Sequence, residues 1–255
     1  MSRPVALVTG ASAGIGADLA RLYADAGFDL VLVARRRARL ETLAESLPVH
    51  CLVVDADLAV SEGPARVYEA VTQAGLQVEE LVCSAGLGSY GRFVELPLDR
   101  ELEQVRVNVE ALVALCRRFA PAMVERGHGR ILNLASLASF QAGPGMATYC
   151  ATKAFVLSFS EALAEELRGT GVTVTAHCPG PVASEFGAAA GNEVSRVFSM
   201  GVASSSSVAA DAFRASRRGE VVRVHGIQNQ LSVFLGRFTP RPLLRRVAAW
   251  MNQPV

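Results

Sequence analysis

Short apolar runs alternate with longer amphipathic stretches along the whole chain. The short runs are typical of strands buried on both faces, whereas the longer stretches repeat apolar residues at helical spacing. The short runs lie near residues 5–8, 30–33, 49–54, 81–83, 130–134, 172–178 and 221–224. This alternation predicts an α/β fold, a doubly wound parallel sheet of about seven strands with helices on both faces.

Three stretches depart from this simple alternation. The helical region over 97–125 is expected to break near Asn108, and residues 185–199 are rich in glycine and alanine with weak patterning. Residues 228–250 form an amphipathic tail that turns from polar to basic. Because no linker or internal repeat is visible, we expect one domain over residues 1–255, in which 225–255 is a C-terminal amphipathic helical extension.

Composition and charge narrow the possible functions. The formal net charge of +1 gives no electrostatic reason to expect nucleic-acid binding. Five cysteines without a CxxC pair or a His/Cys cluster predict reduced thiols in a cytoplasmic protein, and no metal site. We find no signal-peptide pattern and no uncharged apolar run of about 18 residues. His177 has the pattern of a core residue, and Glu79-Glu80 that of a solvated turn or helix face.

A glycine-rich turn follows the first apolar run. It reads Thr9-Gly10-Ala11-Ser12-Ala13-Gly14-Ile15-Gly16, and an amphipathic helix begins at once. Glycines let the backbone approach a pyrophosphate closely, and the helix N-terminus offers free N–H groups and a positive dipole end. A position between the first strand and the first helix is the context of a dinucleotide-binding turn. A tight turn without a ligand is the alternative.

Lys153 is the single lysine of a chain that contains 24 arginines. It follows Tyr149 by four residues, so on a helix the two side chains share one face. Lysine is a compact charge that can exchange its proton, whereas arginine stays protonated. The pair therefore predicts a phenol whose pKa, about 10 when free, is lowered by an adjacent cation. A surface tyrosine beside a solvated lysine is the alternative.

Three motifs, taken together, resemble those of the classical short-chain dehydrogenase/reductase family. They are the turn from Thr9 to Gly16, Ser136 thirteen residues before the tyrosine, and Tyr149-x-x-x-Lys153. The similarity extends to about Val224. The resemblance implies a single-domain Rossmann fold, a nicotinamide dinucleotide as cofactor, and assembly into homodimers or homotetramers.

The residues at the end of the second predicted strand bear on the choice between NAD and NADP. An acidic residue there hydrogen-bonds a ribose 2′-OH, whereas an arginine accommodates a 2′-phosphate. The chain has Arg35 and Arg36, with no acidic residue until Glu41. NADP(H) is therefore favoured over NAD(H), with Arg35 as the main phosphate partner, Arg36 as a second and Ser12 as a hydrogen-bond donor. The alternative is that these arginines form a solvated helix start.

The resemblance implies further cofactor contacts by matching positions. Asp57 matches the acidic residue at the adenine, with Asp55 as a competitor, and Ser184 keeps a hydroxyl for the nicotinamide carboxamide. Cys83-Ser84 stand where the family usually has two asparagines, which puts local hydrogen bonding in doubt. The full implied set is Gly10, Ser12, Gly14, Ile15, Gly16, Arg35, Arg36, Asp57, Leu58, Ala85, Gly86, Asn108, Tyr149, Lys153, Pro179, Gly180, Val182 and Ser184.

The same resemblance implies catalytic roles. Tyr149 is the general acid in reduction and the general base in oxidation, while Lys153 favours the tyrosinate and holds the nicotinamide ribose. Ser136 hydrogen-bonds the substrate oxygen where negative charge develops, and Asn108 helps to position a water that links Lys153 to solvent. From the residues alone, a strand-end cap remains open for Ser136, with Ser139 as an alternative to it, and a surface helix position remains open for Asn108.

The implied function is an NADP(H)-dependent oxidoreductase that interconverts a carbonyl compound and a secondary alcohol. Its rivals are an epimerase or dehydratase of the related extended family and a non-catalytic nucleotide sensor on the same scaffold. We expect the basic tail to pack on a partner subunit, with covering the site or touching an anionic membrane as alternatives. We expect a mobile lid over 187–191 and a small apolar substrate between Leu87, Phe140, Met146, Phe186 and Phe198.

Overall fold

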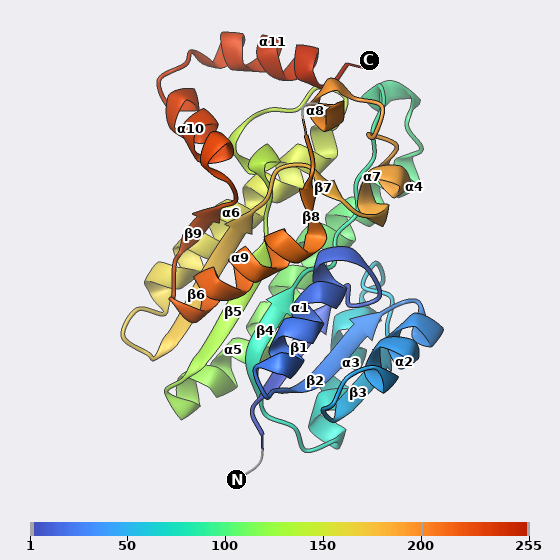
Figure 1. Ribbon diagram of the computed structural model, residues 1–255, viewed down its shortest axis with the longest axis vertical. Coiled ribbons are helices and arrows are strands. Elements are labelled where there is room, and N and C mark those ends of the chain that lie inside the picture. The colour runs from blue at the N-terminus through green and yellow to red at the C-terminus, as the bar shows by residue number, and fades with distance from the viewer. Residues whose placement is uncertain (1–2, 200, 254–255) are drawn as a thin grey trace.

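Seven parallel strands form one sheet in the computed structural model, which describes residues 3–199 and 201–253 (Figure 1). The strand order is β3-β2-β1-β4-β5-β6-β9, so the order reverses between β1 and β4. Ligands bind beside such a reversal, at the carboxyl ends of the strands. The strands are β1 (Val5–Thr9), β2 (Asp29–Ala34), β3 (Cys51–Asp55), β4 (Val78–Cys83), β5 (Gly129–Leu134), β6 (Val172–Cys178) and β9 (Val222–Val224).

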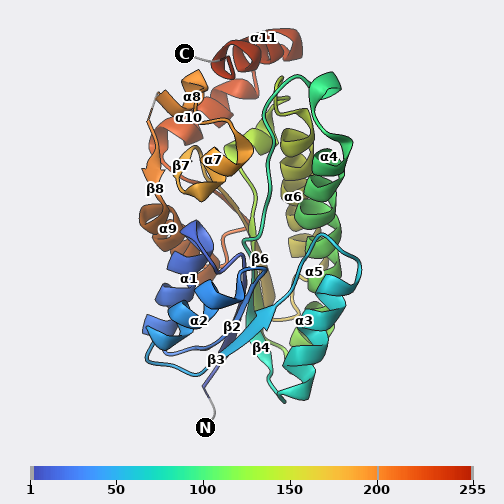
Figure 2. The same cartoon turned by 90° about the vertical axis from the view of Figure 1, so that its right-hand side faces the viewer.

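Helices cover both faces of this sheet, which confirms the predicted doubly wound Rossmann fold (Figure 2). One face carries α1 (Gly14–Asp25), α2 (Arg37–Glu45) and α9 (Ser205–Arg217). The other carries α3 (Glu62–Gln73), α5 (Ala111–Arg126) and α6 (Ala147–Glu166). The helix α4 (Leu98–Val105) runs into α5 through one π-helical turn, η2 (Arg106–Glu110), which is the predicted break near Asn108.

The sheet separates two hydrophobic cores because alternate side chains of a strand point to opposite faces. In β1, Leu7 packs with Leu115 on one side, whereas Val8 packs with Leu19 on the other. All four of these side chains are buried. The cores fix the strands, and so fix the positions of the loops at their carboxyl ends.

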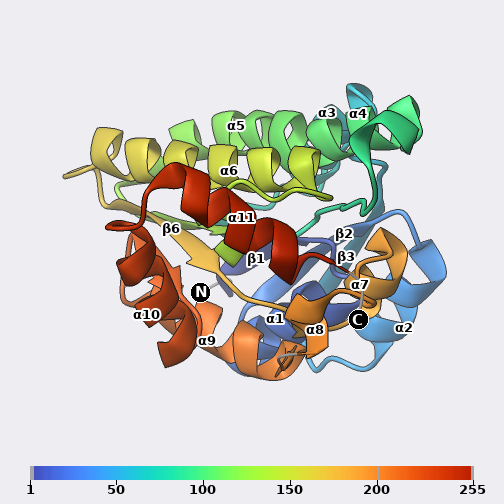
Figure 3. The ribbon, with the colours of Figure 1, turned by 90° about the horizontal axis from the view of Figure 1, so that it is seen from above.

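The C-terminal third places its shorter elements at that same end of the sheet (Figure 3). Residues 185–199, weakly patterned in the sequence, contain two short helices. None of the described helices is long and apolar enough to cross a bilayer. The remaining elements are η1 (Phe93–Glu95), η3 (Leu137–Phe140), β7 (Val182–Ala183), α7 (Glu185–Ala190), α8 (Arg196–Ser199), β8 (Ala203–Ser204), α10 (Ile227–Gly236) and α11 (Arg241–Met251).

The interpretation of Glu79-Glu80 as a solvated face was wrong. Strand β4 begins at Val78 and contains both residues, and Glu80 is only 1% exposed. Its carboxylate accepts hydrogen bonds from Arg130 at 3.1 Å and Arg217 at 2.9 Å. Burial raises the pKa of Glu80, and the two guanidinium groups oppose that rise. The charge is therefore tolerated in the sheet because arginines from two other elements neutralise it.

Candidate active site

A cavity of ≈ 500 Å³ opens at the carboxyl ends of the central strands. Its volume is in the range of small-molecule sites, about 300–1,000 Å³. The glycine-rich turn, the ends of β2, β4, β5 and β6, the start of α6, and α7 all contribute to its wall. Every predicted site residue lines this cavity except Asn108, which lies one layer behind it. Positions spread over most of the chain therefore meet at one place.

The glycine-rich turn leaves open backbone where a phosphate group would lie. Gly14 has a φ of +54°, a left-handed conformation that favours glycine. A Cβ on Gly16 would lie 2.4 Å from the Gly10 carbonyl oxygen, so only glycine fits there. The Thr9 hydroxyl accepts hydrogen bonds from the backbone N–H groups of Ser84 and Ala85, at 3.0 and 3.1 Å. The turn and the loop after β4 are thus held together as a cradle at the N-terminus of α1, which fits a dinucleotide.

The arginines after β2 take different partners. Arg36 donates to the Ser12 hydroxyl through Nε at 3.3 Å and Nη2 at 3.1 Å, directly beside the glycine-rich turn. Arg35 instead pairs with Glu103 of α4 at 2.9 Å. Both line the cavity, but the structure places Arg36 rather than Arg35 against Ser12. The sequence led us to expect Arg35 as the main phosphate partner. In the structure, Arg36 is the arginine that lies against the glycine-rich turn.

Glu185 bridges two arginines across the mouth of this region. Its carboxylate pairs with Arg36 at 2.7 Å and also contacts Arg39. Both guanidinium groups lower the pKa of Glu185. This contact could not be predicted from the sequence, because Glu185 and Arg36 are far apart along the chain and neither belongs to a local motif that pairs them.

Two acidic residues follow β3, and the structure separates their surroundings. Asp55 is engaged by Arg37 at 3.3 Å and by Arg66 at 2.8 Å, and does not line the cavity. Asp57 lines it, and its carboxylate accepts the backbone N–H of Ala59 at 2.9 Å. Of the two residues, Asp57 is the one that lines the cavity, and its contact with the adenine stays a prediction.

Ser136 and Ser139 have different roles. The Ser136 oxygen accepts the N–H of Ala138 at 3.1 Å, which caps η3. Because a hydroxyl accepts through oxygen and donates through its own hydrogen, this cap leaves the Ser136 proton for a substrate. Ser139 accepts the N–H of Ser136 at 3.3 Å and donates to the Lys153 carbonyl at 2.7 Å. Ser139 therefore ties η3 to α6, and Ser136 is the serine that lines the cavity.

Tyr149 and Lys153 lie together at the floor of the cavity, one helical turn apart on α6. The Lys153 ammonium lies 5.9 Å from the centre of the Tyr149 ring and donates to the Leu134 carbonyl at 2.6 Å. Lys153 is only 5% exposed. Burial lowers its pKa to about 8. The alternative of a surface tyrosine beside a solvated lysine is excluded.

The predicted lowering of the tyrosine pKa does not hold in this structure. Burial raises the pKa of Tyr149 to about 12, and the hydroxyl of Ser136 opposes that rise. Desolvation of the phenol is the larger of these two effects. The phenol is consequently protonated at neutral pH.

Asn108 acts on the backbone around the site. Its side-chain oxygen accepts the N–H of Leu87 at 2.8 Å, and its amide donates to the Leu87 carbonyl at 2.9 Å and to Thr152 at 3.0 Å. It is buried within the π-helical turn η2, so a surface helix position is excluded. Asn108 thereby joins the loop after β4 to α6 next to Lys153. A role in positioning water stays a prediction.

The substrate side of the cavity is largely apolar. Four of the five predicted wall residues, Leu87, Met146, Phe186 and Phe198, line it. Phe140 does not, because it packs against the hydrophobic core below α6. Residues that the sequence did not indicate complete the wall, and they include Arg100, Asn192, Met251 and Asn252.

The end of α11 covers part of the cavity. Asn252 donates to the Pro144 carbonyl at 2.9 Å, and its own carbonyl accepts from the Tyr90 hydroxyl. Arg196 donates to the Trp250 carbonyl at 3.2 Å and lies over the Trp250 ring at 5.0 Å. Covering the site was the second of the three expectations for the tail. These contacts fix the tail to the loops around the cavity.

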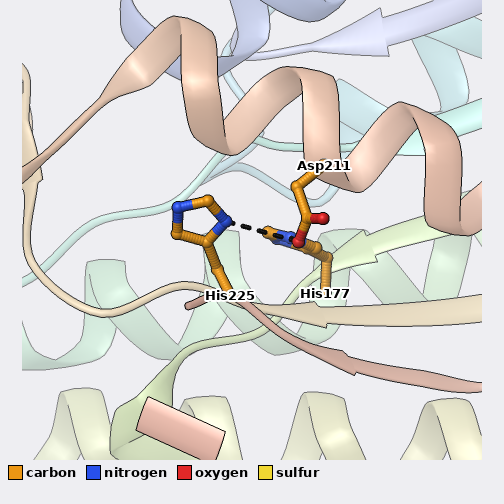
Figure 4. A group of neighbouring side chains, drawn as sticks. All are labelled: His177, Asp211 and His225. Carbon is orange, nitrogen blue, oxygen red and sulfur yellow. Dashed lines mark hydrogen bonds and ion pairs between the residues drawn. The ribbon is translucent and has the colours of Figure 1, made fainter. Parts of the chain in front are cut away.

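A second polar cluster lies behind the cavity, between β6, α9 and β9 (Figure 4). His177, Asp211 and His225 form the one described group of possible metal ligands, with ligand atoms within 4.8 Å of one another. Asp211 accepts from His177 at 3.2 Å, from His225 at 3.3 Å, and from Arg223 at 3.0 and 3.1 Å. The Arg223 guanidinium already neutralises the Asp211 carboxylate. We therefore interpret the cluster as a hydrogen-bonded joint that links β6, α9 and β9. His177 is fully buried, as its strand pattern predicted.

Residues 4–195 match a family model described as short chain dehydrogenase. A short chain dehydrogenase of Pseudocercospora fijiensis is 34% identical over 188 residues, which are 72% of this chain and 61% of that relative. The chain also resembles a solved short-chain dehydrogenase from Sphingobium yanoikuyae in complex with NADPH, at 32% identity, with a TM-score of 0.82 and coverage of 92% and 93% of the two chains. A short chain dehydrogenase/reductase from Burkholderia phymatum in complex with NAD gives 26% identity, a TM-score of 0.84 and coverage of 96% of each chain.

Proposed function

The chain belongs to the short-chain dehydrogenase/reductase family of oxidoreductases, and on that premise we propose that it is an NADP(H)-dependent enzyme that interconverts a carbonyl compound and a secondary alcohol. One observation carries the proposal. Ser136, Tyr149 and Lys153 meet at the floor of the cavity whose far wall is the glycine-rich turn. A reacting carbon between them would have a proton donor, a hydrogen-bond donor and a cofactor within one enclosed space.

The bound nicotinamide cofactor supplies or accepts the hydride. Tyr149 donates the proton to the substrate oxygen in reduction and removes it in oxidation, and its high pKa keeps it in the proton-donating form. Ser136 donates a hydrogen bond to the same oxygen as negative charge develops there. Lys153 stabilises the tyrosinate once the proton has left, and holds the ribose hydroxyls.

Arg35 and Arg36 support a preference for NADP(H). A 2′-phosphate needs cationic donors at the end of β2, where Arg36 contacts Ser12 and Arg35 lies beside it. Glu185 pairs with Arg36 and would compete with the phosphate for that guanidinium. We nevertheless place Arg36 first and Arg35 second as phosphate partners, because Arg36 contacts Ser12 beside the glycine-rich turn whereas Arg35 pairs with Glu103 of α4. The related structures include complexes with NADPH and with NAD, so the preference rests on these residues.

The apolar wall supports a small apolar ketone or secondary alcohol as substrate. Leu87, Met146 and Phe186 provide surface that would exclude water from such a molecule. The exposed apolar residues of α4, among them Leu98 and Leu102, support assembly into a homodimer or homotetramer. We propose a cytoplasmic location from the free cysteines.

A panel of carbonyl compounds and alcohols, followed by the absorbance of NADPH, tests the proposal. We expect NADPH oxidation with at least one apolar ketone, in amounts equal to the alcohol formed. Conversion without net consumption of NADPH would indicate an epimerase or dehydratase, and tight binding without any conversion would indicate a sensor.

The cofactor assignment has its own test. Arg36→Asp should lower kcat/KM for NADPH by about 100-fold relative to NADH, because two charge-assisted hydrogen bonds to the phosphate are lost. Arg168→Asp, which changes an exposed arginine at the end of α6, is the matched control. An unchanged NADPH/NADH ratio in Arg36→Asp would remove this residue from the phosphate site.

A further inference from the structure

Helices α10 and α11 present a large apolar surface to solvent. Every large apolar side chain in it is at least 45% exposed, and Ile227 and Phe238 reach 81% and 74%. Monomeric proteins seldom leave large apolar patches uncovered. We call this surface the tail face, and it consists of Ile227, Leu231, Phe234, Leu235, Phe238, Leu243, Val247 and Trp250.

The helical period puts these residues on one side. In α10, Ile227, Leu231, Phe234 and Leu235 recur at spacings of three and four, and in α11 the same holds for Leu243, Val247 and Trp250. The opposite side of α11 faces the protein, where Ala248 is buried. The more apolar side of each helix therefore points away from the protein, which reverses the usual orientation of a surface helix.

The segment that carries the tail face is also basic. From Gly226 to the C-terminus the chain has four arginines, Arg237, Arg241, Arg245 and Arg246, and no Asp or Glu. All four are exposed, and no carboxylate of the described residues pairs with them. The rest of the chain has 21 basic and 24 acidic residues, a formal net charge of −3. Charge is thus segregated, with the positive pole at the end of the molecule that carries the exposed apolar residues.

The surface is held in a fixed position. Trp250 stacks under Arg196, Asn252 is bonded to the loop that holds Pro144, and Arg196 also donates to the Gln253 side chain at 3.0 Å. At the other end, Asn229 donates to the His225 carbonyl at 2.7 Å, next to the Asp211 joint. Figure 1 shows α10 and α11 together at one extremity of the molecule, away from the helices that cover the sheet.

We propose that the tail face binds the surface of an anionic lipid bilayer. Interfacial helices combine an apolar side that enters the headgroup boundary with arginines that attract anionic lipids, and aromatic residues prefer that boundary. Each exposed arginine near such a surface is expected to strengthen binding about fivefold. No helix need cross the bilayer, and none of the described helices is able to do so.

Charge argues against a second copy of the chain as the occupant. Most homodimers are symmetric, so the same patch would face itself. The two tail segments brought together in this way would carry eight arginines and no carboxylate. Like charges placed opposite each other are destabilising, whereas anionic headgroups would neutralise them.

The single tryptophan makes the proposal directly measurable. Trp250 is half exposed in the tail face, so its fluorescence should shift to shorter wavelength when the protein is added to vesicles of phosphatidylcholine and phosphatidylserine. Vesicles of phosphatidylcholine alone should give a much smaller shift, and added salt should weaken the response. Co-sedimentation with the same vesicles should follow the fluorescence.

Two variants separate the two contributions. Phe234→Ser/Phe238→Ser should weaken vesicle binding at least tenfold, and Arg245→Glu/Arg246→Glu at least 30-fold. Leu98→Ser/Leu102→Ser, which removes exposed apolar residues of α4, and Arg168→Glu are the matched controls and should bind normally. NADPH binding should be unchanged in all four variants, because none of these residues lines the cavity.

Two results would overturn the proposal. One is an unshifted Trp250 emission together with no sedimentation on phosphatidylserine vesicles. The other is a dimer, measured by light scattering, that Phe234→Ser/Phe238→Ser dissociates and Leu98→Ser/Leu102→Ser does not, since the tail face would then be covered by a second copy.

Discussion

Lys153 and Asp211 are both buried charged residues near the carboxyl ends of the strands, but the groups around them have opposite effects on their charge. Lys153 has a backbone carbonyl at 2.6 Å and, among the described residues, no carboxylate in an ion pair with it. Asp211 is surrounded by His177, Arg223 and His225. Burial lowers the pKa of Lys153 to about 8, whereas hydrogen bonds from these donors hold the pKa of Asp211 far below its usual range.

The difference separates the proposed catalytic group, Lys153, from a structural one, Asp211. The charged form of Lys153 is opposed by its surroundings, so the folded protein gives up stability to keep a cation beside Tyr149. The charged form of Asp211 is favoured, so this residue joins β6, α9 and β9 and gains stability for the fold. A perturbed pKa alone does not indicate a function; the direction of the shift and its cause do.

Lys153→Arg should have the largest effect, on activity. Arginine is too broad for the space between Gly86 and the Leu134 carbonyl, and it cannot exchange its proton. We expect kcat/KM for ketone reduction to fall by roughly 10³-fold, or about 4 kcal/mol in transition-state stabilisation. Steady-state kinetics on any active ketone would measure it, and near-normal turnover would show that the lysine is not specifically required.

Asp211→Asn should lower the free energy of unfolding by about 3 kcal/mol at pH 7, because it leaves Arg223 and two histidines without their common acceptor. Urea unfolding would measure this loss. Asp99→Asn, at the start of α4, is a matched control that should change stability little. A loss as small as that of the control would mean that the cluster is not a structural joint.

Lys153→Met should do the opposite and raise the free energy of unfolding at pH 7 by about 2 kcal/mol. The lysine pKa is about 8 in the folded state and 10.5 in the unfolded state, so burying the charged amine destabilises the fold by about 3 kcal/mol. Methionine removes this cost but also removes the hydrogen bond to Leu134, which offsets about 1 kcal/mol of the gain. Wild-type stability should rise between pH 8 and pH 10.5, so the advantage of methionine shrinks there. A destabilised variant at pH 7 would contradict this cost.

The smallest effect should be a loss of stability at mildly acidic pH. Burial lowers the pKa of His177 below the ordinary histidine value of 6.5, so the unfolded chain binds a proton at that position before the folded protein does. The contribution of His177 is therefore complete above pH 6.5 and is lost as the pH falls towards its folded pKa. In thermal unfolding, Tm should decrease as the pH is lowered from 7 to 5. A Tm that increases as the pH is lowered would contradict the lowered pKa of His177.

Local motifs in the sequence predicted the fold and the core of the site. The alternation of apolar runs gave the sheet, and the spacing of Tyr149 and Lys153 gave the pair on α6, because both depend on residues close in the chain. Contacts between distant residues carried no such signal. Glu185 on Arg36, Asn252 over the cavity, and Asp211 between two histidines became visible only in three dimensions.

Burial explains the predictions that were wrong. Desolvation raises the pKa of Tyr149, and Glu80 can be buried in the sheet because two arginines reach its carboxylate. Phe140 is partly buried against the hydrophobic core and does not line the cavity. Each outcome follows from packing across elements, which a one-dimensional pattern does not contain.

The central claim is that Tyr149 transfers the proton in a cavity that already binds NADPH. Tyr149→Phe keeps the ring and removes only the hydroxyl, so it tests the claim most directly. NADPH affinity, measured by cofactor fluorescence, should stay within about tenfold of wild type, while a single turnover of bound NADPH with an active ketone should slow by roughly 10³-fold. Retained turnover in Tyr149→Phe, with NADPH bound normally, would contradict the claim.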